Sequence, residues 1–157
     1  MAALVLLVPL TARKIDITTV ATEYRIGDGD YAVEHTVTIK GTDKRNLLGW
    51  GEFEGTFAVS GFPSADQEIP LVIDFPKFSG LPFVYEFESD LENAVSLDFQ
   101  HISATYNWDA FAALIMQPAG FKGKDGRFLV SGSADRERAI TLAQKLYAGT
   151  LWESVFQ

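Results

Sequence analysis

The sequence contains no cysteine among its 157 residues. A disulfide framework, a thiolate metal site and a cysteine nucleophile are therefore excluded. Two enzyme signatures are missing as well. No Gly-x-Ser-x-Gly segment is present to place a nucleophilic serine on a strand-to-helix turn. No Gly-x4-Gly-Lys-Ser/Thr segment is present to bind a nucleotide phosphate. The motifs therefore predict no catalytic residue, no metal site and no cofactor.

Basic residues are scarce, because 13 Lys and Arg stand against 21 Asp and Glu, which gives a formal net charge of −8. This charge repels phosphate backbones, so nucleic acid is excluded as an expected partner. Much of the excess lies between Asp66 and Asp109, where nine acidic residues accompany one basic residue, Lys77. The segment is typical of a solvated acidic surface, and a site for a cation or a basic partner is the alternative.

Long hydrophobic runs are missing too. The apolar residues 1–10 are about half of the ~20 that a membrane-spanning helix needs, so we expect no membrane span. Arg13 and Lys14 follow this run, whereas a secretory signal carries its positive charge first. We therefore expect a cytoplasmic protein, or an extracytoplasmic one if the run is a truncated anchor. Residues 3–10 are predicted to form a buried strand, and an apolar surface that docks on a partner or a second copy is the alternative.

Two histidines occur, His35 and His101, each on the apolar side of an alternating segment. If they met beside a carboxylate they would form a metal site or an acid–base pair, whereas a buried, hydrogen-bonded histidine is the structural alternative. Carboxylates also share a strand face at residues 52 and 54 and at residues 86 and 88. Their spacing of about 7 Å suits glycosidase chemistry. The alternation predicts instead that both pairs are surface charges.

Alternation of apolar and polar residues is the clearest signal in the sequence, and it is longest over residues 49–63. This stretch predicts a central, curved strand with Phe53, Phe57 and Val59 inside and Glu52 and Glu54 outside. We expect the same core to include Val33, Val37 and Ile39. The glycines of the stretch are predicted to admit a bulky neighbour, a bulge or strong curvature. If the interior holds a cavity, we expect its room at Gly51 and Gly55.

Further alternating segments predict an antiparallel fold. They cover residues 14–24, 31–40, 69–75, 83–88, 95–106 and 127–131. Residues 108–116 fit a short helix or a buried strand equally well. Residues 133–147 predict a helix that Ser133 or Asp135 caps, and the apolar tail at 151–156 is expected to pack back on the sheet. The fold class is therefore mainly β (α+β), a single domain over residues 1–157. We expect an antiparallel β-barrel or β-sandwich of about 7–9 strands with a C-terminal helix at about 134–147.

Several strands followed by one helix resemble a lipocalin-type architecture, although the Gly-x-Trp motif expected near the first strand is not in place, because Trp50 falls several strands in. We expect a non-enzymatic module that binds a small apolar ligand or a protein. The alternatives are an assembly subunit that buries its two apolar ends against a partner, and a hydrolase or isomerase that uses Glu and His. The candidate ligand-binding residues are Trp50, Phe53, Phe57, His35, His101 and Tyr85.

Overall fold

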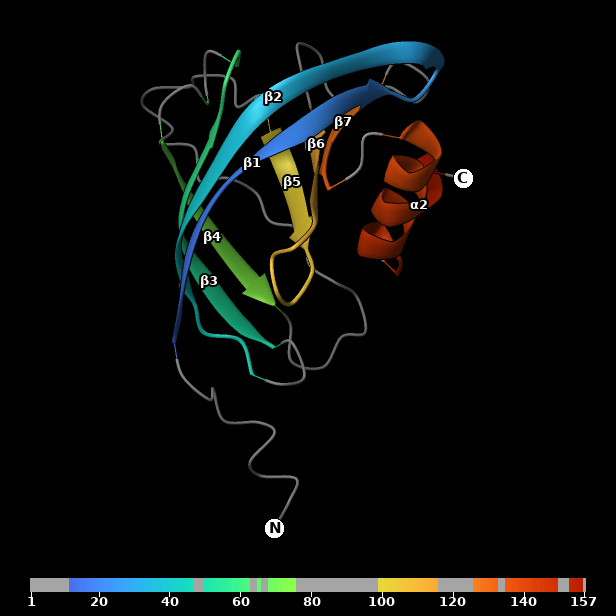
Figure 1. Ribbon diagram of the computed structural model, residues 1–157. Coiled ribbons are helices and arrows are strands. Elements are labelled where there is room, and N and C mark those ends of the chain that lie inside the picture. Colours follow the sequence, from blue (N-terminus) through green and yellow to red (C-terminus); the bar gives the residue numbers. More distant parts are fainter. Residues whose placement is uncertain are drawn as a thin grey trace, which may run out of the picture.

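The computed structural model describes residues 12–46, 50–62, 65, 68–75, 99–115, 126–132, 135–149 and 153–156 (Figure 1). They form seven strands, one α-helix and one short 3-10 helix. The strands are β1 Arg13–Arg25, β2 Asp28–Asp43, β3 Gly51–Val59, β4 Ile69–Phe75, β5 Phe99–Ala104, β6 Phe111–Ile115 and β7 Arg127–Ser131. The helices are α2 Arg136–Tyr147 and η2 Glu153–Phe156.

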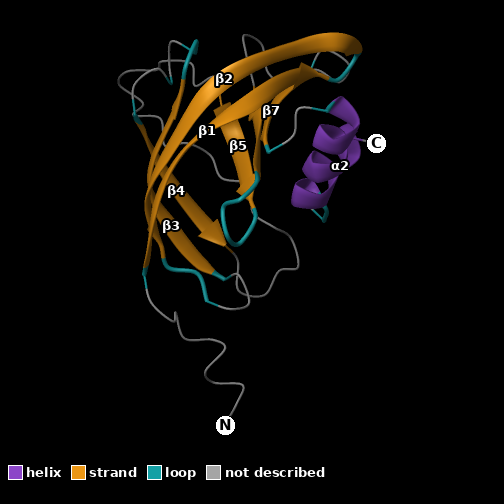
Figure 2. Cartoon of the chain, in the orientation of Figure 1, coloured by secondary structure: helices purple, strands orange, loops and turns teal. Residues whose placement is uncertain are grey.

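The strands form one antiparallel sheet in the order β4-β3-β2-β1-β7-β6-β5. The sheet curls into a half-barrel, and α2 lies outside it (Figures 1 and 2). The predicted fold class, mainly β with one C-terminal helix, is confirmed. Within the described residues the seven strands form an open half-barrel, with β4 and β5 at its edges.

The curl encloses the main core on its inner face. Phe57 of β3 packs edge-on against Phe99 of β5, with ring centroids 5.4 Å apart, so the two sides of the curl meet. Phe53 lies 4.5 Å from Trp108, again between ring centroids. As predicted, Phe53, Phe57 and Val59 are fully buried, and so are Val37 and Ile39. Val33 is the exception: it follows the same alternation but is 40% exposed, because it lies toward the free end of the β1–β2 hairpin.

Glycine permits a close approach between β2 and β3, where Gly41 and Gly55 are register partners. A Cβ at Gly55 would lie 2.1 Å from the Lys40 carbonyl oxygen and 2.8 Å from Cζ of Phe53. The expectation of bulky neighbours beside these glycines is therefore confirmed here. The expectation of cavity room at Gly51 and Gly55 is wrong, because a Cβ at Gly51 would also meet backbone, 2.5 Å from the Lys44 carbonyl oxygen.

A second, smaller core fills the space between the outer face of the sheet and α2. Asp135 caps the helix by accepting a hydrogen bond from the Glu137 N–H, one of the two caps predicted. Ala139, Ala143 and Tyr147 are the buried face of the helix. The tail packs back on the sheet as expected, because the ring of Phe156 lies 5.2 Å from that of Phe128 on β7. No helix in the described part of the chain is long and apolar enough to cross a membrane.

The ambiguous stretch at residues 108–116 contains a strand, β6, at Phe111–Ile115. All five of its residues are buried, because one face lies on the inner core and the other lies under α2. A strand buried on both faces shows no alternation, which is why its sequence could not distinguish it from a helix. The predicted strands at residues 3–10 and 83–88 lie outside the described residues.

The close approach of β2 and β3 generates a stability prediction. Gly55→Ala should lower the free energy of unfolding by about 2 kcal/mol or more, because its Cβ would overlap rigid backbone. Gly29→Ala is the matched control, since a Cβ there meets nothing within 4 Å, and we expect a change of at most about 0.5 kcal/mol. Urea unfolding of both variants measures the difference. Equal stabilities would contradict the close contact.

Candidate functional site

The candidate site is a polar network on the inner face near the free end of the β1–β2 hairpin. Its centre is Glu23 of β1, a carboxylate that is 2% exposed. Tyr31 Oη donates a hydrogen bond to Glu23 Oε1 at 2.8 Å, and Arg127 Nη1 of β7 donates to the same oxygen at 2.9 Å. His35 Nε2 lies 3.0 Å from Glu23 Oε2. Three side chains from the two neighbouring strands, β2 and β7, therefore converge on one buried carboxylate of β1.

Both ring nitrogens of His35 are engaged. Nδ1 lies 2.8 Å from the Ser60 carbonyl oxygen in the β3–β4 connection. Because a carbonyl can only accept, Nδ1 is the donor in this contact. The ring also packs on Phe62, with centroids 4.8 Å apart. His35 therefore ties the network to the β3–β4 connection and has no ring nitrogen directed at open solvent.

The polar atoms at the centre of this network are occupied by protein partners. A general base needs an atom within hydrogen-bond reach of the substrate. Here both Glu23 oxygens and both His35 nitrogens already have protein partners. No group of three or more His, Cys, Asp or Glu residues able to hold a metal ion occurs among the described residues. The arrangement is thus one that fixes side chains in position.

Around this network the inner face is partly open. Arg25, Tyr31 and Arg127 are each of intermediate exposure, and Val33 is exposed. We call these four residues the hairpin-end surface. The Arg25 guanidinium lies over the Tyr31 ring, with Cζ 4.7 Å from the ring centroid. Burial raises the pKa of Tyr31, and the hydrogen bond to Glu23 and the charge of that carboxylate raise it further.

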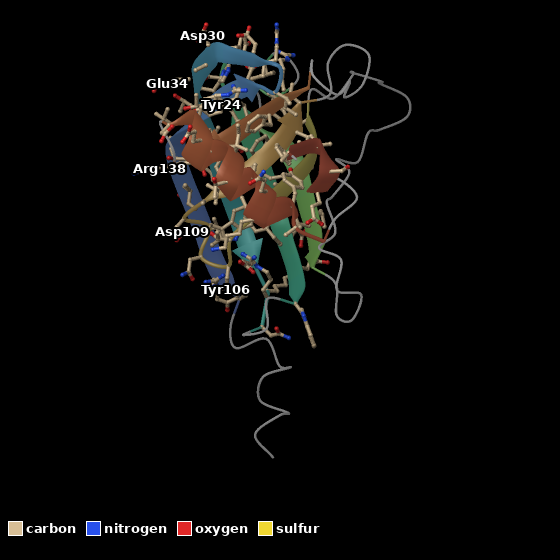
Figure 3. All side chains as sticks on the ribbon, turned by 90° about the vertical axis from the view of Figure 1, so that its right-hand side faces the viewer. Tyr24, Asp30, Glu34, Tyr106, Asp109 and Arg138 are labelled. Atoms are coloured by element: carbon tan, nitrogen blue, oxygen red, sulfur yellow. The ribbon has the colours of Figure 1, made fainter. Side chains whose placement is uncertain are left out.

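A second polar cluster closes the opposite end of the inner face. Figure 3 places Tyr106 at one end of the molecule and Tyr24 and Asp30 toward the other. Asp43, at the end of β2, is 0% exposed, and its Oδ2 accepts from Arg45 Nη2 at 2.7 Å and from Arg13 Nη2 at 2.8 Å. Trp108 Nε1 donates to the same oxygen at 2.9 Å. Asp43 therefore joins β1 and β2 to the turn between β5 and β6.

Trp108 holds an unusual backbone conformation in that turn. Its φ is 60°, the one positive value among non-glycine residues in the described ranges, and φ in this region is strained for a bulky residue. The hydrogen bond to Asp43 and the contact with Phe53 hold the indole in place. Burial by itself raises the pKa of Asp43, but hydrogen bonds from Arg45 and Trp108 and the Arg45 charge outweigh it and lower the pKa to about 2.

The four predicted ligand-binding residues whose side chains the structure describes do not gather at one place. His35 belongs to the Glu23 network, whereas Phe53 and Phe57 lie in the filled aromatic core and Trp50 is half-buried just before β3. His101 is on β5, which is not a neighbour of β2 in the sheet, and its side chain lies outside the described residues, as does Tyr85. A binding role for these six residues stays a prediction.

Sequence reasoning missed the residues that form both clusters. Glu23 and Arg127 are 104 positions apart, and Asp43 and Trp108 are 65 apart, so no local pattern links them. One signal was present for Glu23, which occupies the inward-facing side of the segment at residues 14–24, where an acidic residue needs a partner. Asp43 carried no such signal, because it lies beyond the alternating segment predicted at residues 31–40. Glu52 and Glu54 were predicted to face outward, and both form ion pairs with the exposed side chain of Lys44.

The Asp43 cluster predicts acid sensitivity. Because the pKa of Asp43 falls from an ordinary 3.8 to about 2 on folding, its contribution to stability is complete above pH 4 and is lost as the pH falls toward 2. The loss is about 2 kcal/mol. Urea unfolding of the wild type and of Asp43→Asn should give free energies that converge over this interval. A constant difference down to pH 2 would contradict the assignment.

The Glu23 network predicts a change in the titration of Tyr31. Glu23→Gln removes the carboxylate whose hydrogen bond and charge raise the pKa of Tyr31, so this pKa should fall, because burial alone then opposes the lowering effect of Arg127. NMR of chain labelled with ¹³C at tyrosine Cζ follows the titration. Glu34→Gln is the control, since it removes an equal charge from the outer face of β2. An unchanged Tyr31 pKa in Glu23→Gln would exclude the contact.

Comparisons with protein-family models, curated proteins and solved structures found no match to this chain. The geometry described above is therefore the basis for the functional proposal.

Proposed function

We propose that this chain is a non-enzymatic binding module whose ligand lies on the hairpin-end surface. The observation that carries the proposal is the exposure of Val33, which is 40% exposed although it follows the inward alternation of β2. Large apolar side chains in the inner core are buried, so an exposed valine on this face marks a part of the face that the described residues leave uncovered. A ligand with an apolar part would supply that cover.

The rest of the inner face offers less support for a ligand. Phe53 and Phe57 have 0% exposure, and their rings contact Trp108, Phe99 and Phe111 from the other side of the curl. Space inside a protein core is filled at close to crystal density, so a ligand there would have to displace side chains. The hairpin-end surface needs no such displacement.

Binding is favoured over the Glu- and His-dependent catalysis that the sequence left open. An enzyme of that kind requires a carboxylate or imidazole atom free to take a substrate proton. The network commits those atoms to Tyr31, Arg127, Ser60 and each other. The same bonds fix Tyr31 and Arg127 before a ligand arrives, which reduces the entropy lost on binding.

The ligand class that this surface suits best is a small molecule with an apolar part. The Tyr31 ring and Val33 offer apolar contact, and the two arginines offer hydrogen-bond donors. A protein ligand remains the alternative within the same function. The assembly hypothesis depends on residues 1–10, which lie outside the described residues, and stays a prediction. The lipocalin-type resemblance does not carry the proposal, since a shared architecture does not establish function.

A pair of matched variants tests the proposal. Benzyl alcohol and indole serve as probes, and NMR follows the methyl signals of Val33 and the ring signals of Tyr31. We expect these signals to shift, and Val33→Asp to weaken binding about tenfold because it places a charge in the apolar contact. Val20→Asp is the control, since Val20 is 53% exposed but lies on the outer face.

Circular dichroism checks that both variants keep the wild-type fold. If the probes leave the hairpin-end signals unshifted, or if the two variants weaken binding equally, the hairpin-end surface is not the binding site.

A further inference from the structure

We infer that the hairpin-end surface binds the anionic group of its ligand, a carboxylate or a phosphate, between Arg25 and Arg127. The inference rests on the proposed function and deepens it by naming the charge of the ligand. Nothing in the overall composition suggests such a site, because the chain carries a net charge of −8.

Strand register brings the two arginines together. Arg25 of β1 and Arg127 of β7 are direct Cα partners in the antiparallel pair. Each is two residues from a buried inner-face residue of its own strand, Glu23 and Leu129, so both side chains leave the same face. Side chains that face each other in this way are close neighbours, and like charges at such positions repel. The pair therefore needs negative charge nearby.

Among the described residues, one of the two arginines forms an ion pair and the other does not. Arg127 forms an ion pair with Glu23 at 2.9 Å. Arg25 stacks on Tyr31 and forms no ion pair with any acid in the described residues, and its Nε is buried without a hydrogen-bond partner. Asp28 is the Cα partner of Arg25 on β2 and supplies a negative charge nearby, but among the described residues it forms no ion pair with Arg25, and its Oδ1 accepts the Asp30 N–H.

The charges facing this position balance. Arg25 and Arg127 contribute two positive charges, and Glu23 and Asp28, the Cα partner of Arg25, contribute two negative charges, so the sum is zero with His35 neutral. All four charged groups are at least partly removed from water, which strengthens their effect on a bound ion. The local charge is thus less negative than that of the chain as a whole.

The hydrogen-bonding geometry of the guanidinium group indicates the class of ligand. Two arginine forks side by side suit the oxygens of a carboxylate or phosphate, which accept paired, charge-assisted hydrogen bonds. The Tyr31 ring fixes Arg25 by stacking, while Glu23 fixes both Tyr31 and Arg127. An apolar part of the same ligand would lie on Val33. An amphipathic anion matches this combination of groups.

The test uses the full chain with inorganic phosphate, benzoate and benzamide, the last as the neutral analogue of benzoate. NMR signals of Tyr31 and Val33 report binding at the hairpin-end surface. We expect benzoate to bind at least about tenfold more tightly than benzamide, and added salt to weaken it. The phosphate arm distinguishes the two sources of negative charge, because a shift with phosphate alone assigns the site to phosphate esters.

Arg25→Gln should weaken benzoate binding about tenfold or more, because it removes the unpaired guanidinium. Arg138→Gln is the control: Arg138 is 85% exposed on α2, so it removes an equal charge elsewhere and should leave binding unchanged. Arg25→Gln should change the midpoint of urea unfolding little, since the like-charge contact that it relieves and the stacking on Tyr31 that it removes oppose each other. This second readout is independent of any ligand.

Equal binding of benzoate and benzamide, together with no effect of Arg25→Gln, would overturn the anion site and leave the proposed function intact. If none of the three compounds shifts the Tyr31 and Val33 signals, the anion site is overturned, and the apolar probes then decide the proposed function separately. A fall in the unfolding midpoint of Arg25→Gln larger than the loss of one stacking contact explains would overturn the claim that Arg25 lacks an ion-pair partner in the free protein.

Discussion

One buried carboxylate, Asp43, connects parts of the sheet that strand pairing alone would leave apart. β2 and β5 are separated by three strands in the sheet order, yet Asp43 holds the β5–β6 turn through Trp108 while it pairs with Arg45 and Arg13. A buried charge is costly unless its partners satisfy it, so this cluster can form only when the sheet is curled. The curl, the strained Trp108 and the filled aromatic core all depend on that closure.

The two ends of the inner face differ because their buried acids have different surroundings. At the Asp43 end, aromatic rings from both sides of the curl meet and exclude solvent. At the hairpin end, β1 and β2 extend beyond β3 and β4, and Glu23 binds side chains of β1, β2 and β7 that lie beside it. Their partial exposure makes that end the candidate binding surface. Among the described residues, Arg25 at the hairpin end forms no ion pair, whereas Arg13 and Arg45 at the other end both pair with Asp43.

Local pattern predicted the parts of this structure that depend on neighbouring residues. The strand around Phe53 and Phe57, the helix capped by Asp135 and the buried tail residue Phe156 follow from alternation, capping and an apolar stripe. The candidate site could not be predicted in the same way. Glu23 and Arg127 meet only because β7 pairs with β1, and that non-consecutive pairing is set by the curl of the whole sheet. The sequence could not identify β6 as a strand, because both of its faces are buried and its residues show no alternation.

We propose that the inner face is closed at the Asp43 end and binds an anion at the hairpin end. Intermolecular nuclear Overhauser effects from bound benzoate test it most directly, because they locate the ligand itself. We expect contacts from the benzoate ring protons to the Val33 methyl groups and the Tyr31 ring. Contacts to Phe57 or Trp108 in the filled core, or to Val20 on the outer face, would contradict it.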